Sequence, residues 1–199
     1  MNTVDLWYAT RATGIMALVL LTATMVLGIV VAGRAPGRLA AFARARIHAR
    51  LSALTVTFVA VHVLTSVLDP YVTVGWWSLV LPFGSHYRPG WTALGTVGAD
   101  LLLAVAISSA ARRFVPARAW RALHWLAYLS WPTAVSHALG MGTDARFRWL
   151  QALVSACTAA VVVAAGWRAL EAARARRGRP ATFIEPRPSL RPGPNTEAA

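Results

Sequence analysis

The sequence predicts an all-α protein, a polytopic membrane helix bundle of five transmembrane helices. Of its 199 residues, 57% are hydrophobic and only 14% are charged, which is too apolar for a soluble domain of this length. Five apolar runs are long enough to cross a hydrocarbon core, which takes about 20 helical residues. The runs are Ala12–Ala32, Ile47–Leu68, Trp91–Ala111, Ala119–Leu139 and Trp149–Leu170.

The arginines between these runs predict how the bundle is oriented. All 20 basic residues are Arg, and they alternate between Arg-rich and Arg-poor connections along the chain. The Arg-rich segments follow the first, third and fifth runs, which places them in the cytoplasm. We therefore expect the N-terminus outside and the C-terminus in the cytoplasm, in the inner or plasma membrane. The same placement argues against nucleic acid as the partner of the net charge of +13.

The first run is not expected to be a cleavable signal peptide, because RAPGR follows it instead of a small-residue cleavage site. The connection at 69–90 is rich in aromatic residues, Gly and Pro, so we expect it along the outer interface, with a short helix near Trp76–Leu81. Residues 1–170 are predicted to form one membrane domain, and 171–199 a disordered Arg- and Pro-rich tail. The single Cys157 excludes an internal disulfide.

Four of the five histidines form two matched pairs on the second and fourth runs. His48 and His62 are 14 positions apart, and His124 and His137 are 13 apart, or roughly 20 Å along a helix axis. Both runs start from the cytoplasmic side, so His48 and His124 should lie at an inner level and His62 and His137 at an outer level. His86 falls in the outer connection and has no partner at its depth.

Two imidazoles that face each other at one depth can supply both axial ligands of a haem iron. Two such haems would form a path for electrons across the membrane. A lone histidine in an apolar helix is more often a hydrogen-bonded packing residue, but ionisable groups within membranes tend to be functional. Helical phase is awkward for one pair, because thirteen steps leave His137 roughly 140° from His124. We expect a kink at Pro132 to re-aim it.

Four segments resemble the ferric reductase-like transmembrane family, which includes ferric reductases, the membrane part of NADPH oxidases and the haem subunit of bacterial methionine sulfoxide reductase systems. The resemblance covers roughly residues 7–170 and implies one b-type haem at His48 with His124 and another at His62 with His137, although a single occupied site remains an alternative. The segments are WYATRATGIMALVLLTATMVLGIV (7–30), RIHARLSALTVTFVAVHVLTSVLDP (46–70), SHYRPGW (85–91) and RAWRALHWLAYLSWPTAVSHALGMGTD (118–144).

Ferric reductases and NADPH oxidases continue into a cytoplasmic FAD and NAD(P)H domain, and the tail of this sequence has no Gly-rich phosphate-binding turn. We therefore expect the electron-transfer subunit of a transmembrane oxidoreductase, with a separate flavoprotein or quinol as donor. The external acceptor would be ferric iron, oxygen or a partner protein. One alternative is a quinol-linked haem subunit that feeds an extracytoplasmic reductase. Another is a haem-free transporter or proton channel.

Haem propionates are carboxylates, so an arginine is expected near the edge of each haem. Arg50 and Arg121 are the candidates at the inner level, where snorkelling to the interface is an equally good explanation. Arg11, Arg88 and Tyr87 are the candidates at the outer level.

Asp100 is the one acidic residue well inside a predicted helix. Because an ionised carboxylate is costly there, we expect it to pair with Arg11 or another helix-end arginine, or else to relay protons. Gly95 and Gly98, on the same helix, are predicted to permit close approach of a neighbouring helix.

Overall fold

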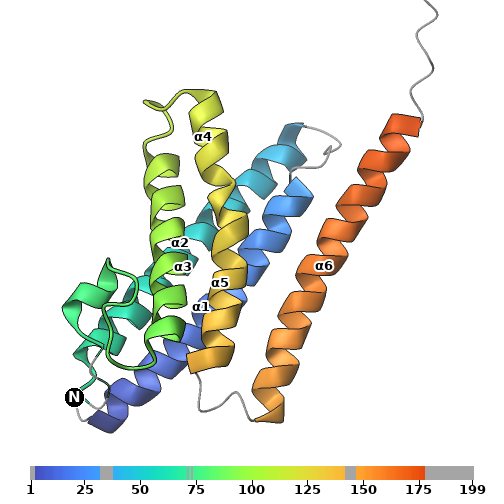
Figure 1. Cartoon of the computed structure of the whole chain (residues 1–199). Helices are drawn as coiled ribbons and strands as arrows, with labels where there is room; N and C mark the ends of the chain where they lie inside the picture. Colours follow the sequence, from blue (N-terminus) through green and yellow to red (C-terminus); the bar gives the residue numbers. More distant parts are fainter. Residues whose placement is uncertain (1–2, 32–37, 71, 73, 142–146, 178–199) are drawn as a thin grey trace, which may run out of the picture.

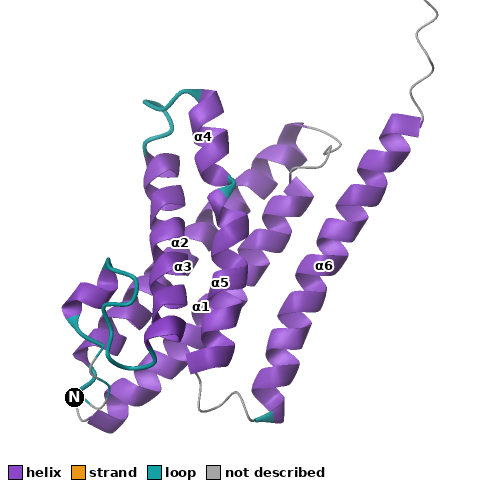
Figure 2. Cartoon of the chain, in the orientation of Figure 1, coloured by secondary structure: helices purple, strands orange, loops and turns teal. Residues whose placement is uncertain are grey.

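The protein is described by a computed structural model, which covers residues 3–31, 38–70, 72, 74–141 and 147–177. The described residues form helices and connecting turns without any strand, which confirms the all-α prediction (Figures 1 and 2). The helices are α1 (Thr3–Val31), α2 (Arg38–Leu68), the 3₁₀ helix η1 (Trp76–Leu79), α3 (Pro89–Ala110), α4 (Ala117–His124), α5 (Leu126–Met141) and α6 (Arg148–Arg177).

Two closely packed helix pairs and one further helix, α6, make up most of the bundle. α1 runs along α2, and α3 runs along α5, while α6 packs mainly against α1 (Figure 1). One end of the bundle, which we call the η1 end, holds η1 and the starts of α1, α3 and α6. The opposite end, which we call the α4 end, holds α4 and the start of α2.

Four helices in the described part of the chain are long and apolar enough to cross a membrane, so the chain is a multi-pass membrane protein. They are α1, α2, α3 and α6, with candidate spans at Val4–Val31, Ala41–Leu68, Pro89–Ala110 and Arg148–Arg177. The predicted single helix at Ala119–Leu139 is divided instead into α4 and α5, which meet at Trp125. Neither part alone reaches the length of a membrane crossing, since α5 has 16 residues.

Side chains are distributed as expected when lipid is the solvent. The two most buried side chains are small and polar, Thr55 and Ser130, each 1% exposed. Large apolar side chains such as Leu103, Val162 and Val163 lie on the outside, each more than half exposed. Membrane helices pack through small residues because lipid already solvates the large apolar ones.

Glycines bring α3 and α5 close together, as predicted. A methyl group on Gly98 would lie 2.9 Å from the hydroxyl oxygen of Thr133. The indole of Trp91 on α3 occupies the space where Gly140 on α5 would carry a side chain. Polar contacts join the other helices, since the Trp131 indole donates to the Thr22 hydroxyl at 3.0 Å.

α6 continues to Arg177, so residues 171–177, which were predicted to begin the disordered tail, are helical instead. The added residues, EAARARR, are mostly Ala and Arg, which favour helix. Arg168 and Glu171 also form an ion pair at 3.7 Å one turn apart. The rest of the predicted tail, residues 178–199, lies outside the described residues.

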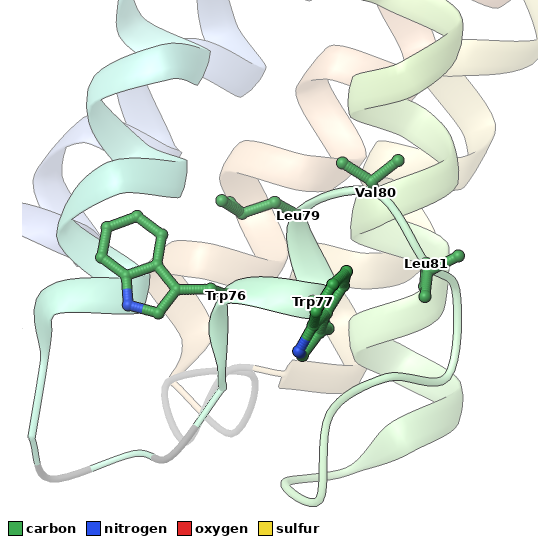
Figure 3. Close-up of a pocket in the computed structure, with 5 residues that line it drawn as sticks. All are labelled: Trp76, Trp77, Leu79, Val80 and Leu81. Carbon is green, nitrogen blue, oxygen red and sulfur yellow. The ribbon is translucent and has the colours of Figure 1, made fainter.

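The aromatic connection carries η1, close to the predicted short helix. Thr96 on α3 holds this segment by donating its hydroxyl to the carbonyl of the buried Ser78 at 2.7 Å. Trp76, Trp77 and the three residues after Ser78 line a hollow of about 380 Å³ (Figure 3). Because Trp77 is 77% exposed and Trp76 60%, η1 presents an apolar surface to its surroundings.

Candidate functional site

The structure brings four of the histidines together as two facing pairs. His62 on α2 faces His137 on α5 with ring centroids 6.3 Å apart and planes at 78°. His48 on α2 faces His124 at the end of α4 with the same centroid distance and planes at 67°. The first pair lies toward the η1 end and the second toward the α4 end, since α2 runs between these ends (Figure 1).

The separation within each pair is the one that a shared metal ion requires. An imidazole nitrogen lies about 2.0–2.1 Å from a first-row metal and about 1.1 Å from the centre of its five-membered ring. Two imidazoles on opposite sides of one ion therefore have centroids about 6.2–6.4 Å apart. Both pairs match this span at 6.3 Å.

The helices α2 and α5, which carry one of the facing pairs, are less closely packed against each other than against their neighbours, as expected if a group is held between them. α1 with α2 and α3 with α5 are close along their lengths, whereas α2 and α5 are not among the closely packed helices of the described chain. The facing imidazoles thus reach across from one helix pair to the other. No cluster of three or more His, Cys, Asp or Glu side chains suited to a metal occurs in the described residues. A metal held here would need most of its ligands from a bound group.

In the pair that lies toward the η1 end, a hydrogen bond to a backbone carbonyl orients each ring. Nδ1 of His62 lies 2.8 Å from the carbonyl oxygen of Thr10 on α1. Nδ1 of His137 lies 2.8 Å from the carbonyl oxygen of Trp91 on α3. Each Nδ1 therefore carries the proton and donates it, which leaves Nε2 with its lone pair free for a metal. Metal-binding histidines usually have such a carbonyl or carboxylate partner on the second nitrogen.

A glycine makes room for each of these rings. A methyl group on Gly14 would lie 2.8 Å from Cε1 of His62, and one on Gly95 would lie 2.6 Å from Cε1 of His137. Each glycine stands one turn after the residue whose carbonyl accepts the bond. The absent side chain is what lets the imidazole reach that carbonyl.

His48 repeats this arrangement in a looser form. A methyl group on Gly28 would lie 3.2 Å from its Cε1, and the carbonyl of Thr24, one turn earlier, is close enough to interact with the ring. That carbonyl does not form a hydrogen bond of acceptable geometry, since Nδ1 of His48 is buried without a partner in the described chain. The ring is in place, but its orientation is less firmly fixed than that of His62.

His124 is supported by aromatic stacking instead of a carbonyl. The indole of Trp120, one turn earlier on α4, stacks on the imidazole with centroids 4.9 Å apart and planes at 24°. The guanidinium of Arg112 lies over the same indole, 4.3 Å from its centroid. Nδ1 of His124 is buried and has no hydrogen-bond partner among the described residues.

Arg88, one of the predicted propionate partners, forms a hydrogen bond with another helix of the protein. Its guanidinium donates to the carbonyl of Gly140 at 2.6 Å, which ties the start of α3 to the end of α5. The carbonyl of Tyr87 accepts the hydroxyl of Thr92 at 2.7 Å, so this residue also serves the start of α3. Cations suit the C-terminal end of a helix, where carbonyls lack partners.

The other arginine candidates lie on an aromatic ring or at the exposed surface. Arg11 stacks over Trp7, with its guanidinium carbon 3.8 Å from the ring centroid. Arg50 and Arg121 are exposed near the α4 end, as snorkelling side chains would be. None of these placements singles out a propionate partner at either level.

Asp100 and His86 are not members of either histidine pair. Asp100 is half-buried on α3 and forms no ion pair with Arg11 or any other described residue. The pairing expected for it is therefore not found. His86 is exposed in the connection before α3.

Sequence reasoning missed Gly14, Gly28, Trp120 and Arg112. The two glycines did leave a signal, because they are 14 positions apart, the same spacing as His48 and His62. Glycines and histidines at one spacing on successive antiparallel helices are expected to meet at two depths. Trp120 left no comparable signal, since tryptophans at helix ends are ordinary in membrane proteins.

No protein-family model, curated protein or solved structure matches this chain.

Proposed function

We propose that the protein is a membrane b-type cytochrome of the ferric reductase-like kind, in which His48 with His124 and His62 with His137 each hold one haem. The observation that supports this best is the repeated centroid separation of 6.3 Å, which equals the span of two axial imidazoles. One coincidental pair of facing histidines would be unremarkable in a helix bundle. Two pairs with the same span, each with one ring on α2, call for a common cause.

The residues of the chain have distinct parts in this proposal. The four imidazoles supply axial nitrogens, and filling both axial positions favours electron transfer over ligand binding. The Thr10 and Trp91 carbonyls fix two of the rings through Nδ1, so that Nε2 of each would be free to hold the iron. The surrounding apolar helices exclude water. When bound, the two haems would supply one-electron chemistry.

The topology that accompanies this function has five crossings, with α4 and α5 together as the fourth. Residues 117–141 span about 37 Å as helix, enough for a hydrocarbon core of about 30 Å. The Arg-rich connections then place the α4 end in the cytoplasm and the η1 end outside, in the inner or plasma membrane. We call His48–His124 the inner pair and His62–His137 the outer pair on this basis.

Electrons would enter from a separate flavoprotein or from quinol and leave to ferric iron, oxygen or a partner protein. The exposed tryptophans of η1 lie at the same end as the outer pair, where indoles are common at the membrane interface. The chain would then act as the electron-transfer subunit of a larger oxidoreductase.

The deciding experiment is a reduced-minus-oxidised optical spectrum of the purified protein with haem quantitation. We expect two haems per chain, falling to one in His62→Ala or His137→Ala and likewise in His48→Ala or His124→Ala. His86→Ala is the matched control and should retain both, because that side chain is exposed in a loop. A folded, colourless protein would contradict the proposal and favour a transporter or proton channel. Block of haem reduction by a quinone analogue would identify quinol as the donor.

A further inference from the structure

The surroundings of Trp120 contain hydrogen-bond donors that nothing in the described chain satisfies. The indole stacks on His124 and carries the Arg112 guanidinium over its ring. Nε1 of Trp120 is buried without a hydrogen-bond partner, and so is Nδ1 of His124. The indole of Trp131 differs in this respect, because its Nε1 donates to Thr22.

Both nitrogens call for an acceptor. An indole N–H can only donate, and an imidazole that offers Nε2 to a metal keeps its proton on Nδ1. A buried donor without an acceptor is costly, and buried polar atoms in proteins are nearly always paired. Two orphaned donors on neighbouring stacked rings therefore indicate a group that the chain itself does not provide.

The charge of Arg112 narrows the chemistry of that group. Its guanidinium lies over the indole and acts electrostatically on His124. Donors beside a cation favour an anionic oxygen, because charge-assisted hydrogen bonds are about twice as strong as neutral ones. An arginine that stacks on an aromatic ring also loses less freedom on binding an oxyanion.

We propose that Trp120 Nε1 and Arg112 bind an anionic oxygen beside His124, at the α4 end of the bundle. This inference rests on the proposed function and adds to it a site on residues that the sequence did not single out. The anion is either a propionate of the haem held by the inner pair or the headgroup phosphate of an acidic phospholipid. In either case the bound anion and its donors set the electrostatic environment of the inner iron.

The test uses Trp120→Phe, which keeps an aromatic ring to stack on His124 and removes only the N–H. Trp131→Phe is the matched control, because it removes an indole N–H whose partner is the chain itself. The full-length holoprotein is titrated potentiometrically, in detergent and in vesicles with and without acidic phospholipid. The same titration is repeated with haem whose propionates are converted to methyl esters.

We expect Trp120→Phe and Arg112→Gln to lower the midpoint potential of one haem only. Each variant removes a hydrogen-bond donor or a positive charge that offsets the negative charge of the anion. If esterified haem abolishes the difference between wild type and Trp120→Phe, the anion is a propionate. If the difference survives esterification and needs acidic phospholipid, the anion is a headgroup phosphate.

The inference would be overturned if Trp120→Phe shifted neither midpoint potential. It would also be overturned if Trp120→Phe shifted both midpoint potentials by the same amount as the control Trp131→Phe does. Loss of haem in Trp120→Phe would leave the potential unmeasurable. Arg112→Gln provides a second variant, which keeps both rings of the Trp120–His124 stack. A wild-type protein that binds no haem would refute the proposed function instead. The two failures are therefore distinguishable.

Discussion

Adding one methyl group at Gly95 should weaken binding of the haem that we propose for the outer pair. The new carbon atom would lie 2.6 Å from Cε1 and Nδ1 of His137, whereas ordinary contact begins at 3.4 Å. The ring must therefore retreat from α3 by roughly 0.8 Å. The accepting carbonyl, that of Trp91, is on the same helix, so the retreat stretches the 2.8 Å bond beyond hydrogen-bonding distance.

The size of the effect follows from these two losses. Overpacking a well-filled site costs about 1–3 kcal/mol, and a lost hydrogen bond costs about 0.5–1.5 kcal/mol. Alanine recovers at most about 1 kcal/mol of helix propensity. Because about 1.4 kcal/mol is a factor of ten, we expect haem affinity at this pair to fall by about one to two orders of magnitude.

The other helix glycines give a graded series that tests the reasoning. The same methyl group would lie 2.8 Å from His62 at Gly14 and 3.2 Å from His48 at Gly28, and at Gly166 it would meet nothing within 4 Å. Haem retention should therefore rise from Gly95→Ala through Gly14→Ala and Gly28→Ala to Gly166→Ala, which should match wild type. The measurement is haem per chain at equal protein and limiting haem.

Two results would refute this reasoning. One is a Gly95→Ala protein that keeps as much haem as Gly166→Ala. The other is a series in which Gly28→Ala, with the mildest of the three contacts, is the most damaging. Either would show that the packing of the imidazoles on these glycines does not control the site.

Three further predictions follow from the same contacts. Trp131→Phe should lower the free energy of unfolding in detergent by about 0.5–1.5 kcal/mol and keep both haems, because it removes only the bond to Thr22; unchanged thermal unfolding would contradict this. Asp100→Asn should change stability by less than about 0.5 kcal/mol, since that carboxylate has no ion pair among the described residues; loss of electron transfer at full haem content would instead support a proton relay. Potentiometric titration of the single-haem variants should find the outer iron lower in potential than the inner, because both outer rings donate Nδ1 to carbonyls, which makes them stronger ligands; the reverse order would overturn this.

Much of the fold could be predicted from the sequence because it depends on local patterns. Hydropathy over about 20 residues marks a crossing whatever its neighbours are. The spacing of His48 and His62 sets their depths through the helical rise alone. Facing partners at both depths then followed from the parallel directions of the second and fourth runs, and the structure brings those side chains together.

The parts that escaped prediction depend on which helices are neighbours. Gly14 and Gly28 matter because α1 runs beside α2, and no property of α1 alone reveals that. The donors of Trp120 and His124 look ordinary in the sequence, and only their burial without a partner distinguishes them. The bond from Arg88 to Gly140 was not foreseen, because it joins helices that lie far apart in the sequence.

The direction in which His137 points depends both on its spacing from His124 in the sequence and on the interruption of the helix in the structure. A straight helix would leave it roughly 140° short of the face that His124 occupies, yet the structure turns it toward His62. The helix is interrupted at Trp125, whose amide lies 3.2 Å from both the Arg121 and the Ala122 carbonyls. Bonding to the third preceding residue winds the chain by about 120° per step instead of about 100°, which adds rotation in the direction needed.

The expected kink at Pro132 is not where the helix is interrupted, because α5 is continuous on both sides of that residue. The discontinuity instead follows directly after His124 and separates α4 from α5. A few tight steps at about 20° each recover only part of the missing rotation. Dividing the segment next to His124 thus lets each imidazole be aimed independently at its own partner on α2.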